Sequence, residues 1–190
     1  MKSVLLLGDS IRIGYCRYVK EELSDIACVC YPEENCRFTQ YTLVTLSDWM
    51  SLVDNPEKVN IIHWNNGHWD IAHWGGEEVS LNSPEQYGIM LERIYHKLCA
   101  GFPNAKIIFA LTTPMNPDGT VGNNPRTNVE IERYNSVACK VMRKLGGQVN
   151  DLYSVISGQS AALYIDYTHF SEEGYQMLAG AVSKVIRENL

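Results

Sequence analysis

Three side chains near the two ends of the chain have the types needed for nucleophilic catalysis: Ser10, Asp166 and His169. A serine hydroxyl attacks a carbonyl carbon only when a base takes its proton and a third group orients that base. His169 follows Asp166 by three residues, so in a turn the carboxylate can bind one ring nitrogen while the other faces the nucleophile. We therefore expect Ser10 to be a nucleophile served by His169 and Asp166. The alternatives are a helix-capping serine and a surface turn.

The sequence on either side of Ser10 predicts a strand followed by a helix. Residues 3–7 are apolar and end at Gly8, and residues 11–23 have apolar side chains at helical spacing. The same criteria predict strands at 27–31, 59–64, 106–111 and 148–151, and helices at 41–52, 84–100, 129–145 and 171–189. This alternation indicates βαβ units and a mainly parallel sheet covered on both faces. Ligands bind such sheets at the carboxyl ends of the strands, where we expect Ser10, residues 35–40, residues 65–70 and the long loop 112–128.

Two motifs, Gly8-Asp9-Ser10 and Asp166-Tyr167-Thr168-His169, together resemble those of the SGNH (GDSL-like) hydrolase family. In that family a Gly-Asp-Ser block follows the first strand and an Asp-x-x-His block lies near the C-terminus, so the resemblance spans nearly the whole chain. It implies an α/β fold: a three-layer α/β/α sandwich with a five-stranded, mainly parallel, flavodoxin-like sheet, in one domain over residues 1–190. It also implies a Ser-His-Asp triad that hydrolyses esters without a cofactor.

The two middle blocks of the family are altered in this chain. The second block, Asn-x-Gly-x-x-Gly-x-Thr, falls on residues 35–42, where Gln40 replaces the glycine whose N–H binds the oxyanion in the family. The third block, Gly-x-Asn-Asp, falls on residues 67–70, where Trp69 replaces the oxyanion-binding Asn. The resemblance therefore implies oxyanion donors from the N–H groups of Ser10 and Gln40 and from a carboxamide. For the last we favour Asn66, with Asn65 as the alternative; both could instead form a strand-ending turn.

Several other polar and aromatic residues are candidates for weaker roles. Asp9, Trp69 and Arg126 are candidate substrate contacts, and Asn128 and Asn135 follow Arg126 in or after the long loop. Trp64, Trp69 and Trp74 could pack in the core or stack on a sugar ring or an acyl chain. The five-residue spacing of His63, His68 and His73 matches no zinc pattern, so we expect no metal site.

Composition narrows the class of protein and its partners. The chain has 190 residues, is 45% hydrophobic and 20% charged, and carries a formal charge of −6 without basic runs, so we expect a globular domain that does not bind nucleic acid. The apolar start is too short to span a membrane and lacks a cleavage site, which favours a cytoplasmic protein. The six cysteines, including Cys28 and Cys30 on one strand face, are expected to be reduced structural thiols. The oligomeric state is not predicted.

The expected function is hydrolysis of an ester, with an acetyl group on a carbohydrate as the favoured substrate. The preference rests on loops rich in Asn, Gln and Trp and on the lack of a long apolar segment that could cover a lipid chain. The alternatives are a short-acyl lipase or thioesterase and, from another class, a flavodoxin-like binding module without turnover, which the altered middle blocks would favour.

Overall fold

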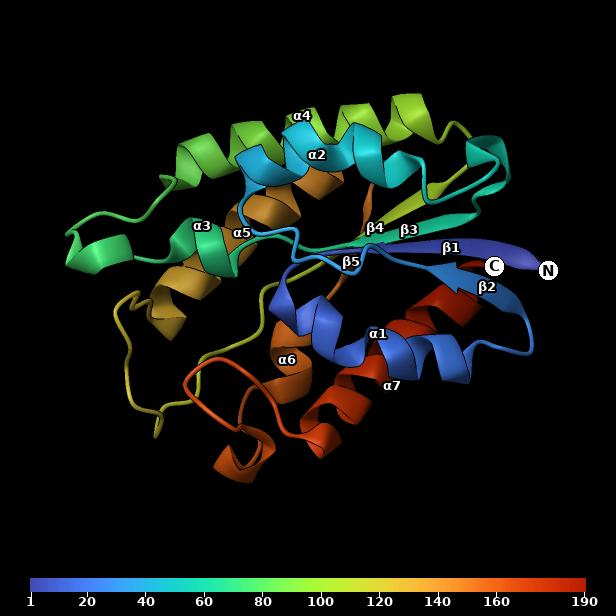
Figure 1. Ribbon diagram of the computed structural model, residues 1–190. Helices are drawn as coiled ribbons and strands as arrows, with labels where there is room; N and C mark the ends of the chain where they lie inside the picture. Colours follow the sequence, from blue (N-terminus) through green and yellow to red (C-terminus); the bar gives the residue numbers. More distant parts are fainter.

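Figure 1 shows a computed structural model of residues 1–190, in which five parallel strands form one twisted sheet. The strands are β1 (Lys2–Leu7), β2 (Ala27–Cys30), β3 (Ile61–Trp64), β4 (Lys106–Ala110) and β5 (Gln148–Asn150). Their order in the sheet is β2-β1-β3-β4-β5, and every neighbouring pair is parallel. This is the flavodoxin-like order, in which the direction of winding reverses between β1 and β3 and leaves a crevice at the carboxyl ends of those strands.

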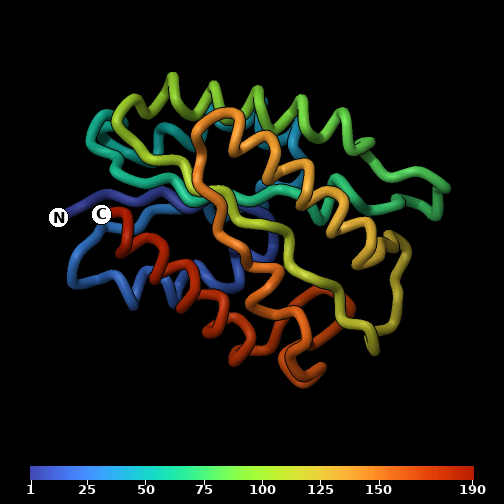
Figure 2. The backbone as a smooth tube through the Cα atoms, turned by 180° about the vertical axis from the view of Figure 1, so that it is seen from behind, coloured from blue at the N-terminus to red at the C-terminus, as the bar shows by residue number.

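Helices cover both faces of the sheet (Figure 1). They are α1 (Ser10–Glu22), α2 (Thr39–Met50), α3 (His68–Ile71), α4 (Pro84–Gly101), α5 (Asn128–Leu145), α6 (Leu152–Ile156) and α7 (Glu172–Asn189). Helices α1, α6 and α7 lie on one face, whereas α2, α4 and α5 lie on the other. Figure 2, the reverse view, agrees with Figure 1 that the two chain termini lie side by side at one edge of the molecule. The result is the expected three-layer α/β/α sandwich.

The interior strand β1 supplies apolar side chains to both halves of the core. Val4 and Leu6 pack with α1 and α7, whereas Leu5 and Leu7 pack on the opposite face, and all four are fully buried. A strand buried on both faces has no polar positions to alternate with apolar ones. This explains why residues 3–7 form a continuous apolar run that ends where the chain leaves the sheet.

The strands and long helices begin and end within about two residues of their expected positions. One of the two-residue shifts is at α2, which begins at Thr39 and not at residue 41, because a cap comes from outside the helix. Its N-cap residue, Phe38, has no capping side chain, and the carboxylate of Asp70 accepts hydrogen bonds from the backbone N–H and hydroxyl of Thr39. Short α3 and α6 were not expected; at four and five residues they carry too little periodicity to detect.

All six cysteines are unpaired in the structure. Cys28 and Cys30 share one face of β2, where Cys28 is exposed and Cys30 is half-buried, whereas Cys36 is fully buried beside the first turn of α1. No helix combines the length and the apolar character required to cross a membrane.

Candidate active site

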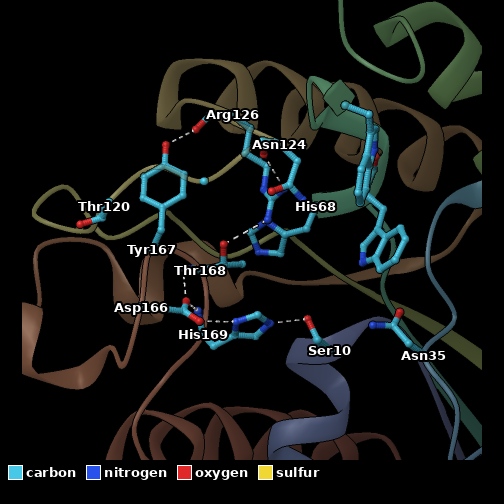
Figure 3. A pocket seen from close by; sticks show the side chains of 13 residues that line it. Ser10, Asn35, His68, Thr120, Asn124, Arg126, Asp166, Tyr167, Thr168 and His169 are labelled. Atoms are coloured by element: carbon cyan, nitrogen blue, oxygen red, sulfur yellow. Dashed lines mark hydrogen bonds and ion pairs between the residues drawn. The ribbon is translucent and has the colours of Figure 1, made fainter. Parts of the chain in front are cut away.

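Ser10, His169 and Asp166 form a continuous hydrogen-bonded chain, although 159 residues separate the first two (Figure 3). The Nε2 atom of His169 lies 2.9 Å from the hydroxyl of Ser10, and its Nδ1 atom lies 2.8 Å from Oδ2 of Asp166. A carboxylate only accepts hydrogen bonds, so Nδ1 carries the proton and Nε2 is left to accept from the serine. The structure therefore brings together the three residues expected to do chemistry, in the tautomer that a general base needs.

The turn before α1 holds the Ser10 hydroxyl at the edge of the sheet. Asp9 is the N-cap of α1, and its Oδ1 accepts the N–H of Ile11 at 3.0 Å. Gly8 has a φ of 157°, and a Cβ at this position would lie 1.9 Å from Oδ1 of Asn65. Ser10 is the first residue of the helix, so its backbone N–H has no carbonyl one turn earlier within α1. That N–H and the positive end of the helix dipole are available to negative charge near the hydroxyl.

A short loop before α7 holds the other two residues. Oδ1 of Asp166 accepts the backbone N–H groups of Thr168 and His169, each at 2.6 Å, so the carboxylate orders the loop as well as the imidazole. Partial burial acts to raise the pKa of Asp166, but these two N–H groups and the His169 ring outweigh it and hold the pKa below its usual value. Asp166 is therefore ionised at neutral pH and holds the His169 ring in one orientation.

A cavity of about 380 Å³ opens beside the triad, a size suited to a small ligand. Its lining is mostly polar and comprises Ser10, Asn35, His68, Trp69, Trp74, Thr120, Gly122, Asn124, Arg126, Asp166, Tyr167, Thr168 and His169. Trp69 and Trp74 form an aromatic wall: their ring centroids are 4.9 Å apart, and the Trp74 indole donates to the carbonyl of Trp69. Such a wall can stack against a sugar ring or an apolar acyl group.

Two buried residues of the lining adjoin the triad loop. The guanidinium of Arg126 donates to the hydroxyl of Thr168 at 3.1 Å, and only 6% of Arg126 is exposed. His68 is 2% exposed and shares a 3.0 Å hydrogen bond with the hydroxyl of Thr113. Burial, and then the positive charge of Arg126, hold the pKa of His68 well below its usual value, so its ring is neutral at pH 7.

The structure places Asp9 away from the substrate cavity, which corrects the expectation that it contacts substrate. Its side chain is fully buried and caps α1, and it does not line the cavity. Burial raises the pKa of Asp9, and the neighbouring Asn65 carboxamide and the Ile11 N–H act to lower it. Trp69 and Arg126, the other two candidate substrate contacts, do line the cavity, whereas Asn128 and Asn135 do not: their carboxamides bind the backbone of Met115 and Thr112.

The other residues expected to donate to the oxyanion do not line the cavity either; they are Asn66, Asn65 and Gln40. Asn66 is fully buried; its Oδ1 accepts from the indole of Trp64, and its Nδ2 donates to the carbonyl of Arg37 and the hydroxyl of Thr42. Asn65 lies behind the nucleophile turn, against Gly8 and Asp9. Gln40 is the second residue of α2, and its side chain pairs with Asn82. Asn65 and Asn66 follow the end of β3, as expected, but both side chains are buried, and Gln40 lies in the first turn of α2.

Asn35 and His68 line the cavity, although neither is among the residues expected to act in the site. Asn35 occupies the Asn position of the family's second block, so the motif is the signal in the sequence that identifies it. His68 was grouped with His63 and His73, and the three diverge in the structure. His63 is fully buried in β3, next to Tyr15 and Asn150, and His73 pairs with Glu130. No group of three or more potential ligands could hold a metal ion.

No known family profile matches the sequence, and no curated protein is similar to it. Solved structures do match over nearly the full length. A lipase/acylhydrolase from Enterococcus faecalis is 19% identical with a TM-score of 0.76, over 99% of this chain and 96% of the other. A carbohydrate acetylesterase from Sinorhizobium meliloti is 13% identical with a TM-score of 0.77, over 100% of both chains.

An acetyl xylan esterase is 14% identical with a TM-score of 0.77, over 97% of this chain and 99% of the other. At these identities the matches establish the fold alone. The architecture expected from the two terminal motifs is confirmed by them and by the sheet order. The chain has the fold of the SGNH (GDSL-like) hydrolases.

Proposed function

We propose that this protein is a serine esterase with Ser10 as nucleophile, His169 as general base and acid, and Asp166 as the group that orients the histidine. The observation that carries the proposal is the hydrogen-bonded chain from Ser10 through His169 to Asp166, at 2.9 and 2.8 Å. A helix-capping role for Ser10 would not require an imidazole at its hydroxyl. The capping role in α1 belongs to Asp9.

In the first half-reaction, Oγ of Ser10 bonds to the ester carbonyl carbon while its proton moves to Nε2 of His169. The carbonyl π electrons move to oxygen, and the resulting oxyanion lies near the free N–H of Ser10 at the start of α1. Collapse of this intermediate breaks the bond to the alcohol oxygen, which receives the proton from His169. Water then attacks the acyl-enzyme with His169 again as base, and releases the acid and the serine.

For the substrate we favour an acetyl ester on a carbohydrate. Most residues that line the cavity are polar and offer hydrogen-bonding groups, and the wall formed by Trp69 and Trp74 suits a sugar ring. Trp69 would contact the sugar, and Arg126, whose guanidinium is already bound to Thr168, would donate to a substrate oxygen. Two proteins with this fold, the carbohydrate acetylesterase and the acetyl xylan esterase, carry names that agree with this choice.

The alternative substrate is a longer acyl ester or thioester, which the same aromatic wall favours because it could pack against an acyl chain. Rates of hydrolysis of 4-nitrophenyl acetate and 4-nitrophenyl octanoate separate the two. The carbohydrate acetylesterase proposal predicts a higher kcat/KM for the acetate and release of acetate from acetylated oligosaccharides. A higher kcat/KM for the octanoate would favour the lipase.

A fluorophosphonate probe tests the enzyme class itself, because it labels only an activated serine. We expect the wild-type protein to be labelled and the Ser10→Ala variant to be unlabelled and inactive. Labelling that persists in Ser10→Ala would overturn the choice of nucleophile. A folded wild-type protein that neither reacts with the probe nor hydrolyses any ester would favour the binding module without turnover.

A further inference from the structure

Asn35, the first residue of the altered second block, lies beside Ser10 at a place where an oxyanion donor is needed, whereas Gln40 and Trp69 replace the donor residues of the family. It lies in the loop between β2 and α2 and lines the same cavity as Ser10 and His169. Figure 3 shows its carboxamide nitrogen pointing toward Ser10, on the side opposite His169. This nitrogen makes no hydrogen bond within the protein, whereas the carboxamide of Asn66 is fully engaged.

The orientation of the Asn35 carboxamide is fixed by its own loop. Its Oδ1 atom accepts the backbone N–H of Arg37 at 2.7 Å. Only the oxygen of a carboxamide can accept a hydrogen bond, so this contact determines which end faces the cavity. The NH₂ group is therefore the end that faces Ser10, and it has two protons to donate.

Arg37, whose N–H binds the Asn35 side chain, has a strained left-handed backbone conformation. Arg37 has a φ of 53° and is the only residue other than glycine with a positive φ. A left-handed conformation at such a residue costs about 1–2 kcal/mol and persists only where the surroundings impose it. Here Nδ2 of Asn66 binds the carbonyl of Arg37 at 2.9 Å, and the Arg37 guanidinium lies over the ring of Tyr41. Asn66 thus acts as a positioning residue: it binds Arg37, and Arg37 in turn binds Asn35, which lines the cavity.

The loop that carries Asn35 is tied to the turn that carries Ser10. The N–H of Cys36 donates to the carbonyl of Gly8 at 3.0 Å, and the N–H of Gly8 donates to the Cys36 sulfur at 3.2 Å. The buried guanidinium of Arg12, two residues after Ser10, donates to the carbonyls of Pro32 and Glu34. These bonds fix Asn35 relative to the nucleophile, which is the preorganisation that an oxyanion donor requires.

We infer that the Asn35 carboxamide is a catalytic oxyanion donor that acts together with the backbone N–H of Ser10. This inference rests on the proposed esterase function. As the Ser10 oxygen bonds to the carbonyl carbon and His169 takes its proton, the carbonyl oxygen gains the negative charge, and Nδ2 of Asn35 donates to it. Asn35 thereby replaces the donor that the family's third block would supply at the position of Trp69.

The Asn35→Asp variant tests this directly, because it separates the two ends of the side chain. Aspartate keeps an oxygen that can accept the Arg37 N–H, but it replaces the donating NH₂ with an oxygen that repels an oxyanion. With 4-nitrophenyl acetate we expect kcat to fall at least about 10²–10³-fold while KM changes little. Asn35→Ala should lose a similar factor, whereas Asn104→Ala, a matched change at an exposed residue that binds Glu57, should retain wild-type kcat.

Affinity for a trifluoromethyl ketone provides a second readout, because its serine adduct carries the same oxyanion. We expect Asn35→Asp to weaken this inhibitor by about the factor by which it lowers kcat. If Asn35→Asp folds and keeps kcat within about tenfold of wild type while Ser10→Ala is inactive, the Asn35 inference fails and the esterase proposal stands. Activity that survives in Ser10→Ala would instead defeat the esterase proposal.

A variant that does not fold leaves the wild-type adduct as the test. In a crystal structure of the wild-type protein with the bound ketone, the adduct oxygen should lie about 2.7–3.1 Å from Nδ2 of Asn35. An adduct oxygen directed away from Asn35 would overturn the inference.

Discussion

Replacing Asp166 with asparagine would change the protonation of His169 with little change in shape. Oδ1 of Asp166 accepts the N–H groups of Thr168 and His169, and an asparagine oxygen can keep both contacts. Oδ2 accepts from Nδ1 of His169 at 2.8 Å, and in Asp166→Asn an NH₂ group would occupy this position. Because the NH₂ can only donate, the proton on the ring would move to Nε2, which then could not accept the proton of Ser10.

The size of the loss follows from the exposure of the carboxylate. In a serine protease, the same change at a buried aspartate lowers kcat by about 10⁴-fold. Here 51% of the Asp166 side chain is exposed, so water can compete for Nδ1 and part of the population keeps the active tautomer. We therefore expect kcat to fall by about 10³-fold, which corresponds to roughly 4 kcal/mol of transition-state stabilisation. KM should change much less.

The assay is steady-state hydrolysis of 4-nitrophenyl acetate, with the thermal midpoint measured on the same samples. Asp25→Asn is a matched control, because Asp25 is similarly exposed and pairs with Arg187. The control should keep wild-type kcat, and neither variant should lose its cooperative thermal transition. If Asp166→Asn stays within about tenfold of wild-type kcat while Ser10→Ala is inactive, the tautomer argument is refuted.

Three further predictions concern groups around the site. Arg12→Met should lower the free energy of unfolding by about 3–5 kcal/mol, because the carbonyls bound by the buried guanidinium would lose their donors. Urea titrations measure this loss, and an unchanged urea midpoint would contradict the prediction. Burial raises the pKa of Asp70 from 3.8 to about 6, so the folded protein binds more protons than the unfolded chain between those values and its stability falls as pH rises through this window. Asp70→Asn should abolish that pH dependence, and a persistent fall between pH 4 and 6 would refute the assignment. Trp69→Ala should raise KM for an acetylated oligosaccharide more than for 4-nitrophenyl acetate, and equal effects on both would argue against a sugar-stacking role.

The sheet and its helices could be predicted because their signals are local. Residues 3–7 form an unbroken apolar run, which indicates a strand buried on both faces, and Ser83 and Pro84 mark the beginning of α4. The start of α2 could not be placed from its own sequence, because the capping group is the carboxylate of Asp70, 31 residues away. The four residues of α3 are likewise defined by the turn at Gly67 and not by periodicity.

The site was only partly predictable, for a related reason. The approach of His169 to Ser10 could be anticipated, because each residue ends a recognisable motif and both motifs are expected at the same edge of the sheet. The direction of the Asn66 side chain could not, because it depends on the hydroxyl of Thr42 in α2 and on the carbonyl of Arg37 in the loop before that helix. The orientation of Asn35 depends on one left-handed residue, Arg37, and no local rule assigns that conformation to an arginine.

The most direct test of the central claim is to identify the acylated residue during turnover. The wild-type protein is mixed with 4-nitrophenyl acetate, quenched in acid on the millisecond scale, digested and analysed by mass spectrometry. The account predicts one acetyl group on the peptide that contains Ser10, and loss of this acetylation in His169→Ala, which has no base to activate the serine. Steady ester hydrolysis with no acetylated Ser10 at any time point, or an acetyl group on another residue, would contradict it.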